Sequence, residues 1–206
     1  MAHDRKPHDR RGADRPPRRD GRPPRPSGDE RLSRFLAFVL RHHPEEANLT
    51  MDEDGTVGLD ELAEAVRTRP GLESMTRGEI ERLVTAQSPP RFEILGDRIR
   101  ARYGHTLPRQ VRFEPADPPE TLFHGTTAEV AEHVLTEGLQ PSGRQYVHLS
   151  VDTPAAREIG QRHTPQPVIL RIDTESARKA GARFYPTGPA VWLSDPIPPE
   201  CITRLE

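Results

Sequence analysis

The sequence has little of what crosslinks a chain or anchors it in a membrane. Cys201 is the only cysteine, so neither an intramolecular disulfide nor a two-cysteine metal site can form, as is usual in a reducing compartment. No apolar run is long enough to cross a bilayer, and the basic N-terminus lacks the apolar segment of a secretory signal. We therefore expect a cytoplasmic protein with no membrane partner.

Several familiar chemistries are also missing. No glycine-rich phosphate loop of the G-x-G-x-x-G or P-loop type occurs, which argues against Rossmann and P-loop nucleotide sites. There is no recognisable Ser/His/Asp set, carboxylate pair or metal-ligand spacing. Residues 50–61 partly match an EF-hand loop, but Thr50 stands where an aspartate is needed and Pro44 blocks the entering helix. We expect no metal ion.

Charge is distributed unevenly along the chain. The formal net charge is −2, yet residues 1–28 contain nine Lys or Arg and only four Asp. These residues are also rich in proline and nearly free of large apolar side chains, which predicts a disordered tail. The tail is either a solubilising extension or an electrostatic tether for RNA. Because the remainder is acidic overall, other RNA contacts need a local basic cluster.

Ordered structure is expected from about Asp29. Apolar residues at helical spacing over 32–40 predict a helix with one buried face, which ends before Pro44. This leaves Arg41 and His42 at the helix C-terminus, where cations also simply favour the helix dipole.

The rest of the first half predicts a short strand on each side of an Asp54-Gly55 turn, two further helices and a hairpin. Three helices followed by a hairpin indicate a winged-helix module, a fold that binds either nucleic acid or protein. The expected ranges are 48–57 for the two short strands, about 60–67 and 76–86 for the helices, and 92–95 with 98–102 for the hairpin.

The second half is separated by a proline-rich connector, residues 106–120. Beyond it, residues 121–206 alternate short apolar runs with amphipathic segments, which predicts a compact α+β fold around a split sheet. We thus expect a tail (1–28), a first domain (29–105), the connector and a second domain (121–206). The second domain should have strands at 122–126, 146–150, 168–172, 183–185 and 190–193. Helices are expected over the apolar positions 130–135, ending at Gly138, and near 153–161 and 176–180.

Two of these strands carry a histidine close to one end. His124 is followed by Gly125 and Thr126, and His148 is preceded by Arg144. Either histidine alone is well explained as a structural residue with a hydrogen-bond partner. Together, with a glycine that permits close backbone approach and an arginine suited to phosphate, they predict a cleft for a small polar ligand.

The pattern of motifs resembles the KptA-type RNA 2′-phosphotransferases, a branch of the ADP-ribosyltransferase superfamily. The resemblance covers roughly residues 31–206. Its motifs are Leu40-Arg41-His42, Ile99-Arg100-Ala101, Gly104-His105, His124-Gly125-Thr126, Gly138-Leu139, Arg144, Val147-His148-Leu149-Ser150 and Val191-Trp192-Leu193. It implies a winged-helix lobe followed by an ADP-ribosyltransferase-like lobe with a split β-sheet, in an α+β protein that acts as a monomer.

The resemblance also implies a reaction and two partners, NAD as co-substrate and an RNA carrying a 2′-phosphate, such as the one left by some tRNA splicing ligases. The 2′-phosphate attacks C1″ of the nicotinamide riboside and displaces nicotinamide. The ribose 2″-hydroxyl then attacks phosphorus, which frees 2′-hydroxyl RNA and ADP-ribose 1″,2″-cyclic phosphate. Neither step needs a metal.

Site residues follow from the matching motif positions. Arg41, His42, Arg100 and Arg144 correspond to the family's catalytic set, with Arg41, Arg100 and His42 also touching the RNA. Arg144 is expected to favour the second step and His42 to move a proton in it. His105 is a further RNA-side candidate. The implied NAD pocket is lined by His124, Gly125, Thr126, His148, Leu149 and Ser150.

Two positions depart from the pattern. Pro189-Ala190 stands where much of the family has Asn-Gly, so a side-chain contact to NAD from that asparagine is lost or made through backbone. Val191 occupies the region where other ADP-ribosyltransferases place a catalytic glutamate, which argues against ADP-ribosylation of proteins. Two other functions remain open: an ADP-ribosyltransferase that caps terminal phosphates of RNA or DNA, and a winged-helix nucleic-acid-binding protein without catalysis.

Overall fold

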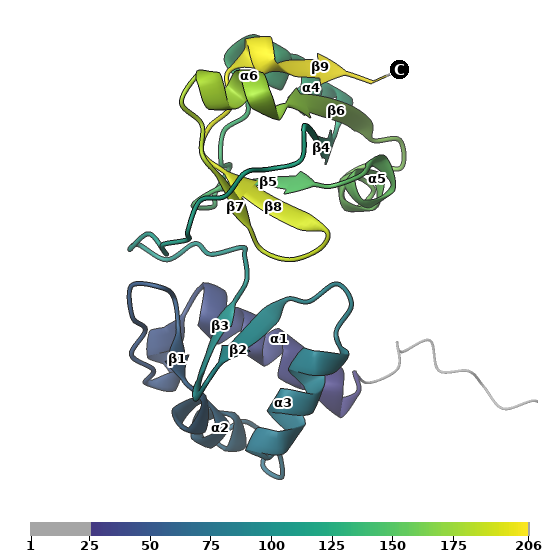
Figure 1. The fold of residues 1–206 in the computed structure, drawn as a ribbon. Coiled ribbons are helices and arrows are strands. Elements are labelled where there is room, and N and C mark those ends of the chain that lie inside the picture. Colours follow the sequence, from purple (N-terminus) through teal and green to yellow (C-terminus); the bar gives the residue numbers. More distant parts are fainter. Residues whose placement is uncertain (1–25, 206) are drawn as a thin grey trace, which may run out of the picture.

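A computed structural model describes residues 26–205, so the expected disorder of the tail lies largely outside the described residues. Within that range the chain is a mixed α/β protein with six α-helices and two antiparallel sheets (Figure 1). It forms two lobes stacked one above the other, the first lobe (28–101) and the second lobe (121–204), and each has its own apolar core. No helix there is long and apolar enough to span a membrane.

The first helix of the first lobe carries two site candidates at its end. Helix α1 (Gly28–Arg41) begins at Ser27, whose hydroxyl caps the backbone of Glu30 while the Glu30 carboxylate accepts from the Ser27 N–H. Its buried face is that predicted from spacing, and a 3₁₀ turn, η1 (Pro44–Ala47), follows. Arg41 therefore lies in the last turn of a helix that the core holds in place.

The remaining elements of this lobe match the prediction with one exception. Helices α2 (Leu59–Arg67) and α3 (Arg77–Ala86) are present, and β2 (Phe92–Leu95) and β3 (Arg98–Ala101) form the hairpin. The strand expected before Asp54-Gly55 is wrong. There the Asp52 carboxylate accepts from the Asp54 and Thr56 N–H groups, which makes a side-chain-held turn, and only β1 (Val57–Gly58) joins β3.

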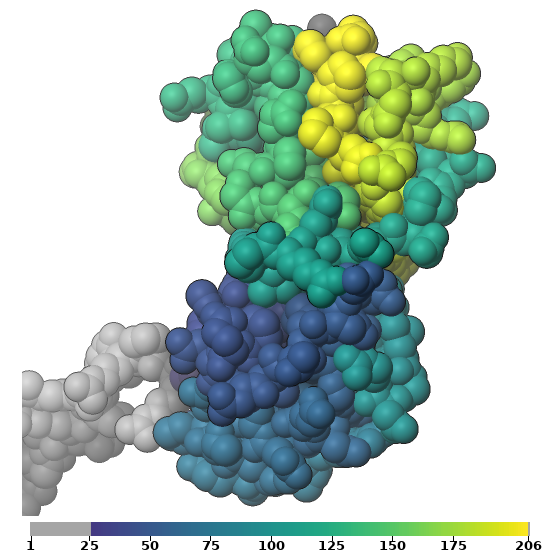
Figure 2. All heavy atoms as spheres, turned by 90° about the vertical axis from the view of Figure 1, so that its left-hand side faces the viewer, coloured from purple at the N-terminus to yellow at the C-terminus, as the bar shows by residue number. Residues whose placement is uncertain are grey.

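The connector between the lobes has no helix or strand, yet both lobes hold it. The Arg112 N–H donates to the Glu53 carbonyl at 3.1 Å, and the Ala116 N–H donates to the Phe184 carbonyl at 2.9 Å. Val111 is buried, and its carbonyl accepts from the Tyr146 hydroxyl at 2.9 Å. In Figure 2 the teal connector lies across the junction of the lobes. These contacts fix how the two lobes face one another.

The second lobe is built on a six-stranded sheet in the order β7-β8-β5-β4-β6-β9. All the predicted strands and helices are present; β9 was not predicted, because three residues after a proline-rich stretch are too short to show alternation. The strands are β4 (Thr121–Thr126), β5 (Val147–Ser150), β6 (Val168–Asp173), β7 (Phe184–Pro186), β8 (Val191–Ser194) and β9 (Ile202–Arg204), and the helices are α4 (Ala128–Glu137), α5 (Thr153–Gly160) and α6 (Thr174–Lys179).

The sheet opens between its two central strands. β4 pairs with β6 along its whole length, from Thr121 to Thr126. It pairs with β5 only where Phe123 lies opposite Ser150. Past that point the strands separate, and a side chain takes over the link: the Nδ1–H of His124 donates to the His148 carbonyl at 3.0 Å. This opening gives the second lobe its main cavity.

Candidate active site

A cavity of about 790 Å³ lies at this opening, a size typical of small-molecule sites. Its walls are β4, β5, α4 and α5, and Tyr103 reaches it from the segment that follows the first lobe. Five of the six residues expected to hold a ligand line it: His124, Gly125, Thr126, His148 and Leu149. The sixth, Ser150, is 2% exposed and is not among the lining residues.

The hydrogen bonds of His148 define its protonation state. Its Nδ1 lies 3.0 Å from the Tyr146 carbonyl, which can only accept, so Nδ1 carries the proton. Burial, with Arg144 next in importance, lowers the pKa of His148 to about 3, so the ring is neutral at pH 7. Its free Nε2 then accepts from Nη1 of Arg144 at 3.3 Å. Arg144 is thereby oriented at the cavity by the strand that follows it.

Gly125 is needed where β4 packs against α5. A Cβ on this residue would lie 1.8 Å from the Ala156 carbonyl oxygen and 3.2 Å from the Gly160 nitrogen, both in α5. The close backbone approach that glycine permits here is to this helix. Its backbone still lines the cavity, because α5 packed against β4 forms one wall.

Several cavity residues were not predicted as site residues. His133 and Val130 come from α4, and Glu158 and Ile159 from α5, with Arg162 and His163 just beyond it. Helical spacing alone marks Val130 as a core residue, although it is exposed and faces the cavity. Which face of α4 and α5 meets the cavity is decided by packing. No local motif identifies these residues.

At the Tyr103 side of the cavity, cationic residues from both lobes come together. Arg41 and His42 end α1, and Arg144 precedes β5. A Cβ built on Gly104 would lie 3.3 Å from Nη1 of Arg144 and 3.5 Å from both Cδ and Cζ of Arg41. The two arginines therefore meet over Gly104, which has a φ of +90°, a conformation that L side chains rarely adopt.

Among residues 26–205 Arg41 has no anionic partner. Its guanidinium lies 5.2 Å from the ring centre of Tyr103 and 5.8 Å from that of Phe92. Its Nε and Nη2 are buried and make no hydrogen bond in the described structure. Burial, followed by repulsion from Arg91, lowers the pKa of Arg41 to about 10. A half-buried cation with two buried, unpaired donors is costly, so the site favours an incoming anion.

His105 lies inside the same cluster. It is 2% exposed, and its Nε2 has no hydrogen-bond partner among residues 26–205. Burial lowers the pKa of His105 to about 4, with further lowering by Arg41, Arg100 and His42. The neutral imidazole leaves an unpaired ring nitrogen inside the cluster, which can take part in a hydrogen bond.

His42 is tied to the connector. Its Nδ1 is 2.8 Å from the Thr106 hydroxyl, and the Thr106 N–H donates to the Arg41 carbonyl at 3.0 Å. Burial lowers the pKa of His42, and the nearby Arg41 charge lowers it further. The side chain is therefore neutral at pH 7 and fixed in orientation, as a proton acceptor needs to be.

Of the three arginines predicted to be catalytic, Arg100 is the one that pairs with a carboxylate in the described structure. Its Nε pairs with Glu93 at 2.6 Å, and its Nη1 donates to the Asp54 carbonyl at 3.0 Å. The guanidinium lies 5.4 Å from the ring centre of Phe113. The pairing follows from the hairpin register, which places Glu93 directly across from Arg100. Arg100 is thus more constrained than Arg41.

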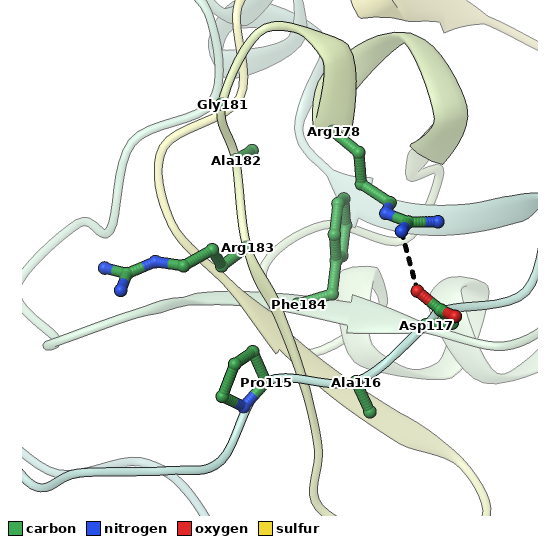
Figure 3. A pocket seen from close by; sticks show the side chains of 8 residues that line it. All are labelled: Pro115, Ala116, Asp117, Arg178, Gly181, Ala182, Arg183 and Phe184. Atoms are coloured by element: carbon green, nitrogen blue, oxygen red, sulfur yellow. Dashed lines mark ion pairs between the residues drawn. The ribbon is translucent and has the colours of Figure 1, made fainter.

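A second, smaller hollow of about 380 Å³ lies away from this cluster (Figure 3). Arg178 and Asp117 point toward one another there and form an ion pair at 2.7 Å, whereas Arg183 points away. Neither arginine is free for an anion, since Arg183 pairs with Asp195 at 2.9 Å. Among residues 26–205 no group of three His, Cys, Asp or Glu side chains is arranged to hold a metal ion.

Comparisons with known proteins give a consistent result. The model of the RNA 2′-phosphotransferase, Tpt1 / KptA family matches residues 27–196. A relative in Thermococcus kodakarensis is 41% identical over 174 residues, 84% of this chain and 96% of that protein. Relatives in Streptomyces griseus and Acetivibrio thermocellus are 39% and 36% identical, over 82% and 84% of this chain and 93% and 94% of theirs. All three are described as probable RNA 2′-phosphotransferases.

Proposed function

Because the chain belongs to the Tpt1 / KptA family of RNA 2′-phosphotransferases, we propose that it removes an internal 2′-phosphate from RNA with NAD as co-substrate. The names of the family and of the relatives support the enzyme class and the RNA substrate. We further propose that residues 29–105 form a winged-helix lobe and residues 121–206 an ADP-ribosyltransferase-like lobe, in a cytoplasmic monomer. The three helices with a hairpin and the opened antiparallel sheet support this assignment.

The NAD proposal is supported by the chemistry of the cavity. Its volume of about 790 Å³ suits a large polar ligand, and Arg144 supplies a cationic group for a diphosphate. His124 and Thr126 on β4 and His148 on β5 add polar atoms along one wall. When bound, NAD supplies an electrophilic C1″ carbon and nicotinamide as leaving group.

The first step forms a bond between a 2′-phosphate oxygen and C1″ and breaks the bond to nicotinamide. The phosphate is already a nucleophile and needs to be positioned, not deprotonated. Half-buried Arg41 carries this assignment, because its guanidinium keeps two unpaired donors, Nε and Nη2, and a guanidinium is suited to hold a phosphate against the cavity. Arg144, which meets Arg41 over Gly104, approaches the same place from the other lobe.

In the second step the ribose 2″-hydroxyl attacks phosphorus and the RNA 2′-oxygen leaves with a proton. Neutral His42, fixed by the Thr106 hydroxyl, is suited to accept the proton of the attacking hydroxyl. Arg144 stabilises the charge that develops on the phosphate oxygens. Arg100, already paired with Glu93, contributes charge from a fixed position.

The deciding experiment uses the full chain, NAD and a short RNA with one internal 2′-phosphate. We expect 2′-hydroxyl RNA, nicotinamide and ADP-ribose 1″,2″-cyclic phosphate. Arg144→Ala should accumulate an RNA–ADP-ribose adduct, because the first step survives and the second is slowed. Arg178→Ala, in the hollow of Figure 3, is the matched control and should turn over normally.

Other outcomes favour the alternatives. A stable adduct formed by the wild type on a terminal phosphate, with no cyclic product, would indicate a capping ADP-ribosyltransferase. RNA binding with NAD left intact would indicate a nucleic-acid-binding protein. The neutral histidines and the unpaired Arg41 donors favour catalysis over binding alone, because a binding surface needs neither.

A further inference from the structure

An exposed aromatic residue lies directly beside the phosphate-binding cluster. Phe38 is 40% exposed, and it is the only aromatic among the large exposed hydrophobic side chains of residues 26–205. It belongs to α1, three and four residues before Arg41 and His42. Residues at this spacing share one side of a helix. The ring is therefore one helical turn from the proposed phosphate site.

The ring belongs to a short series of rings that leads into the site. The Phe38 and His43 ring centres are 5.0 Å apart at an angle of 35°, and those of His43 and His42 are 6.4 Å apart. The Nδ1 of His43 lies 3.0 Å from the Glu45 carboxylate, which fixes the ring against Phe38. The His43 side chain is 51% exposed. A flat aromatic surface is thus held in place and open to solvent.

The size and charge of this surface indicate its ligand. Phe38 is an isolated apolar group, with exposed Arg34 one turn before it on α1 and Arg41 one turn after it. A protein partner would need a broad apolar patch, whereas one flat ring beside cations suits a nucleobase attached to phosphates. Single-stranded RNA is commonly recognised by stacking unpaired bases on such rings.

We propose that Phe38 and His43 bind the base of a nucleotide adjacent to the one that carries the 2′-phosphate. This rests on the proposed function, since it assumes that the phosphate binds at Arg41. The platform holds the flanking nucleotide while Arg41 and His42 hold the phosphate, so that the RNA is positioned at two points. It makes single-stranded RNA the preferred substrate, because a paired base cannot reach the ring.

The test measures binding of a short 2′-phosphorylated RNA to the full chain without NAD, by fluorescence anisotropy. It uses the intact RNA and two versions that lack the base on the 5′ or the 3′ side of the phosphorylated nucleotide. We expect Phe38→Ala to weaken binding of the intact RNA about tenfold, within the range for one lost base–aromatic stack. One abasic RNA should bind the wild type about tenfold more weakly. Phe38→Ala should bind that abasic RNA as tightly as the wild type binds it.

Two variants control this experiment. Phe38→Trp keeps a ring and should bind as the wild type does. Leu95→Ala removes another exposed apolar side chain of the first lobe, 49% exposed, from the far end of β2 and should have no effect. Equal binding of intact RNA by Phe38→Ala and the wild type would overturn the proposal. It would also be overturned if Phe38→Ala weakened binding of both abasic RNAs as much as binding of the intact RNA.

Turnover with NAD, measured on the same samples, separates the two proposals. If the wild type processes the RNA but Phe38→Ala binds it normally, only the base platform is wrong. If the wild type binds but does not turn over, the binding comparison still decides the platform while the proposed reaction fails. If the wild type neither binds nor turns over 2′-phosphorylated RNA, both proposals are overturned.

Discussion

The guanidinium of Arg41 lies 5.2 Å from the ring centre of Tyr103, and no carboxylate pairs with it in the described structure. Tyr103 also meets the ring of His148 edge-on at 6.0 Å, so it links Arg41 at the end of α1 to β5 of the second lobe. It supports the half-buried cation from one side, while Nε and Nη2 stay unpaired. This arrangement makes the ring a positioning element.

Replacing Tyr103 tests that role. Tyr103→Leu should lower kcat about fivefold to tenfold, which corresponds to the loss of a partly desolvated cation–π contact, with a smaller effect on KM for NAD. Tyr103→Phe keeps the ring and should retain most of the activity. Steady-state kinetics of phosphate removal measures both. Equal losses in the two variants would instead assign the role to the hydroxyl group.

Gly104 separates Arg41 and Arg144, and its substitution should affect activity more than stability. With φ at +90°, Gly104→Ala strains the backbone by about 1–2 kcal/mol. The new Cβ would also lie 3.3 Å from Nη1 of Arg144, so the two guanidinium groups must move apart. We expect a loss of about 10²-fold in kcat, as for a displacement of roughly 1 Å at a reacting group.

Gly96→Ala is the matched control for this substitution. Gly96 has a φ of +62°, and a Cβ there would have nothing within 4 Å. The Gly96→Ala variant should lose about as much unfolding free energy in urea as Gly104→Ala does, and should keep normal turnover. If both variants lose activity in proportion to their stability, the spacing of the arginines is not what Gly104 provides.

The neutral state of His105 predicts a pH dependence of stability. The folded pKa of about 4 is below the ordinary value of 6.5, so the unfolded chain binds more protons between these values. This contribution is complete above pH 6.5 and is lost as the pH falls toward 4. By pH 5 about 2 kcal/mol of this contribution to the unfolding free energy should be lost.

Urea unfolding at pH 7.5 and pH 5 measures this effect. His105→Asn should be less stable than the wild type at pH 7.5. Between pH 7.5 and pH 5 its unfolding free energy should fall by about 2 kcal/mol less than that of the wild type. His133→Asn, at an exposed position on α4, is the control and should keep the full dependence. An unchanged pH dependence in His105→Asn would contradict the buried, neutral assignment.

Gly125 should tolerate no side chain. In Gly125→Ala the Cβ would lie 1.8 Å from the Ala156 carbonyl oxygen, which is backbone and cannot rotate away. The helix α5 must shift from β4, which we expect to cost more than about 3 kcal/mol and to distort the cavity wall. Thermal unfolding measures the loss. Gly78→Ala, in α3 with only Thr76 Oγ1 at 3.9 Å, should be neutral or slightly stabilising.

The local elements were predictable because local chemistry determines them. The Thr76 and Glu79 pair begins α3 as the capping motif indicates, and the apolar spacing of α1 gives its buried face. The turn at Asp52 was mispredicted because a side chain, not a strand partner, satisfies the backbone there. The short β9 has too few residues to show a pattern and is recognised only through its pairing with β6.

The sequence alone determined the helices, most strands, the family and the identity of the arginines and histidines that meet at the junction. Only the tertiary structure decided what each can do. Among the described residues it leaves half-buried Arg41 without an acid, places Gly125 against α5 and keeps His105 and His148 neutral. The reason is that burial and charge pairing depend on residues distant in the chain, as when Arg41 and Arg144 meet over Gly104.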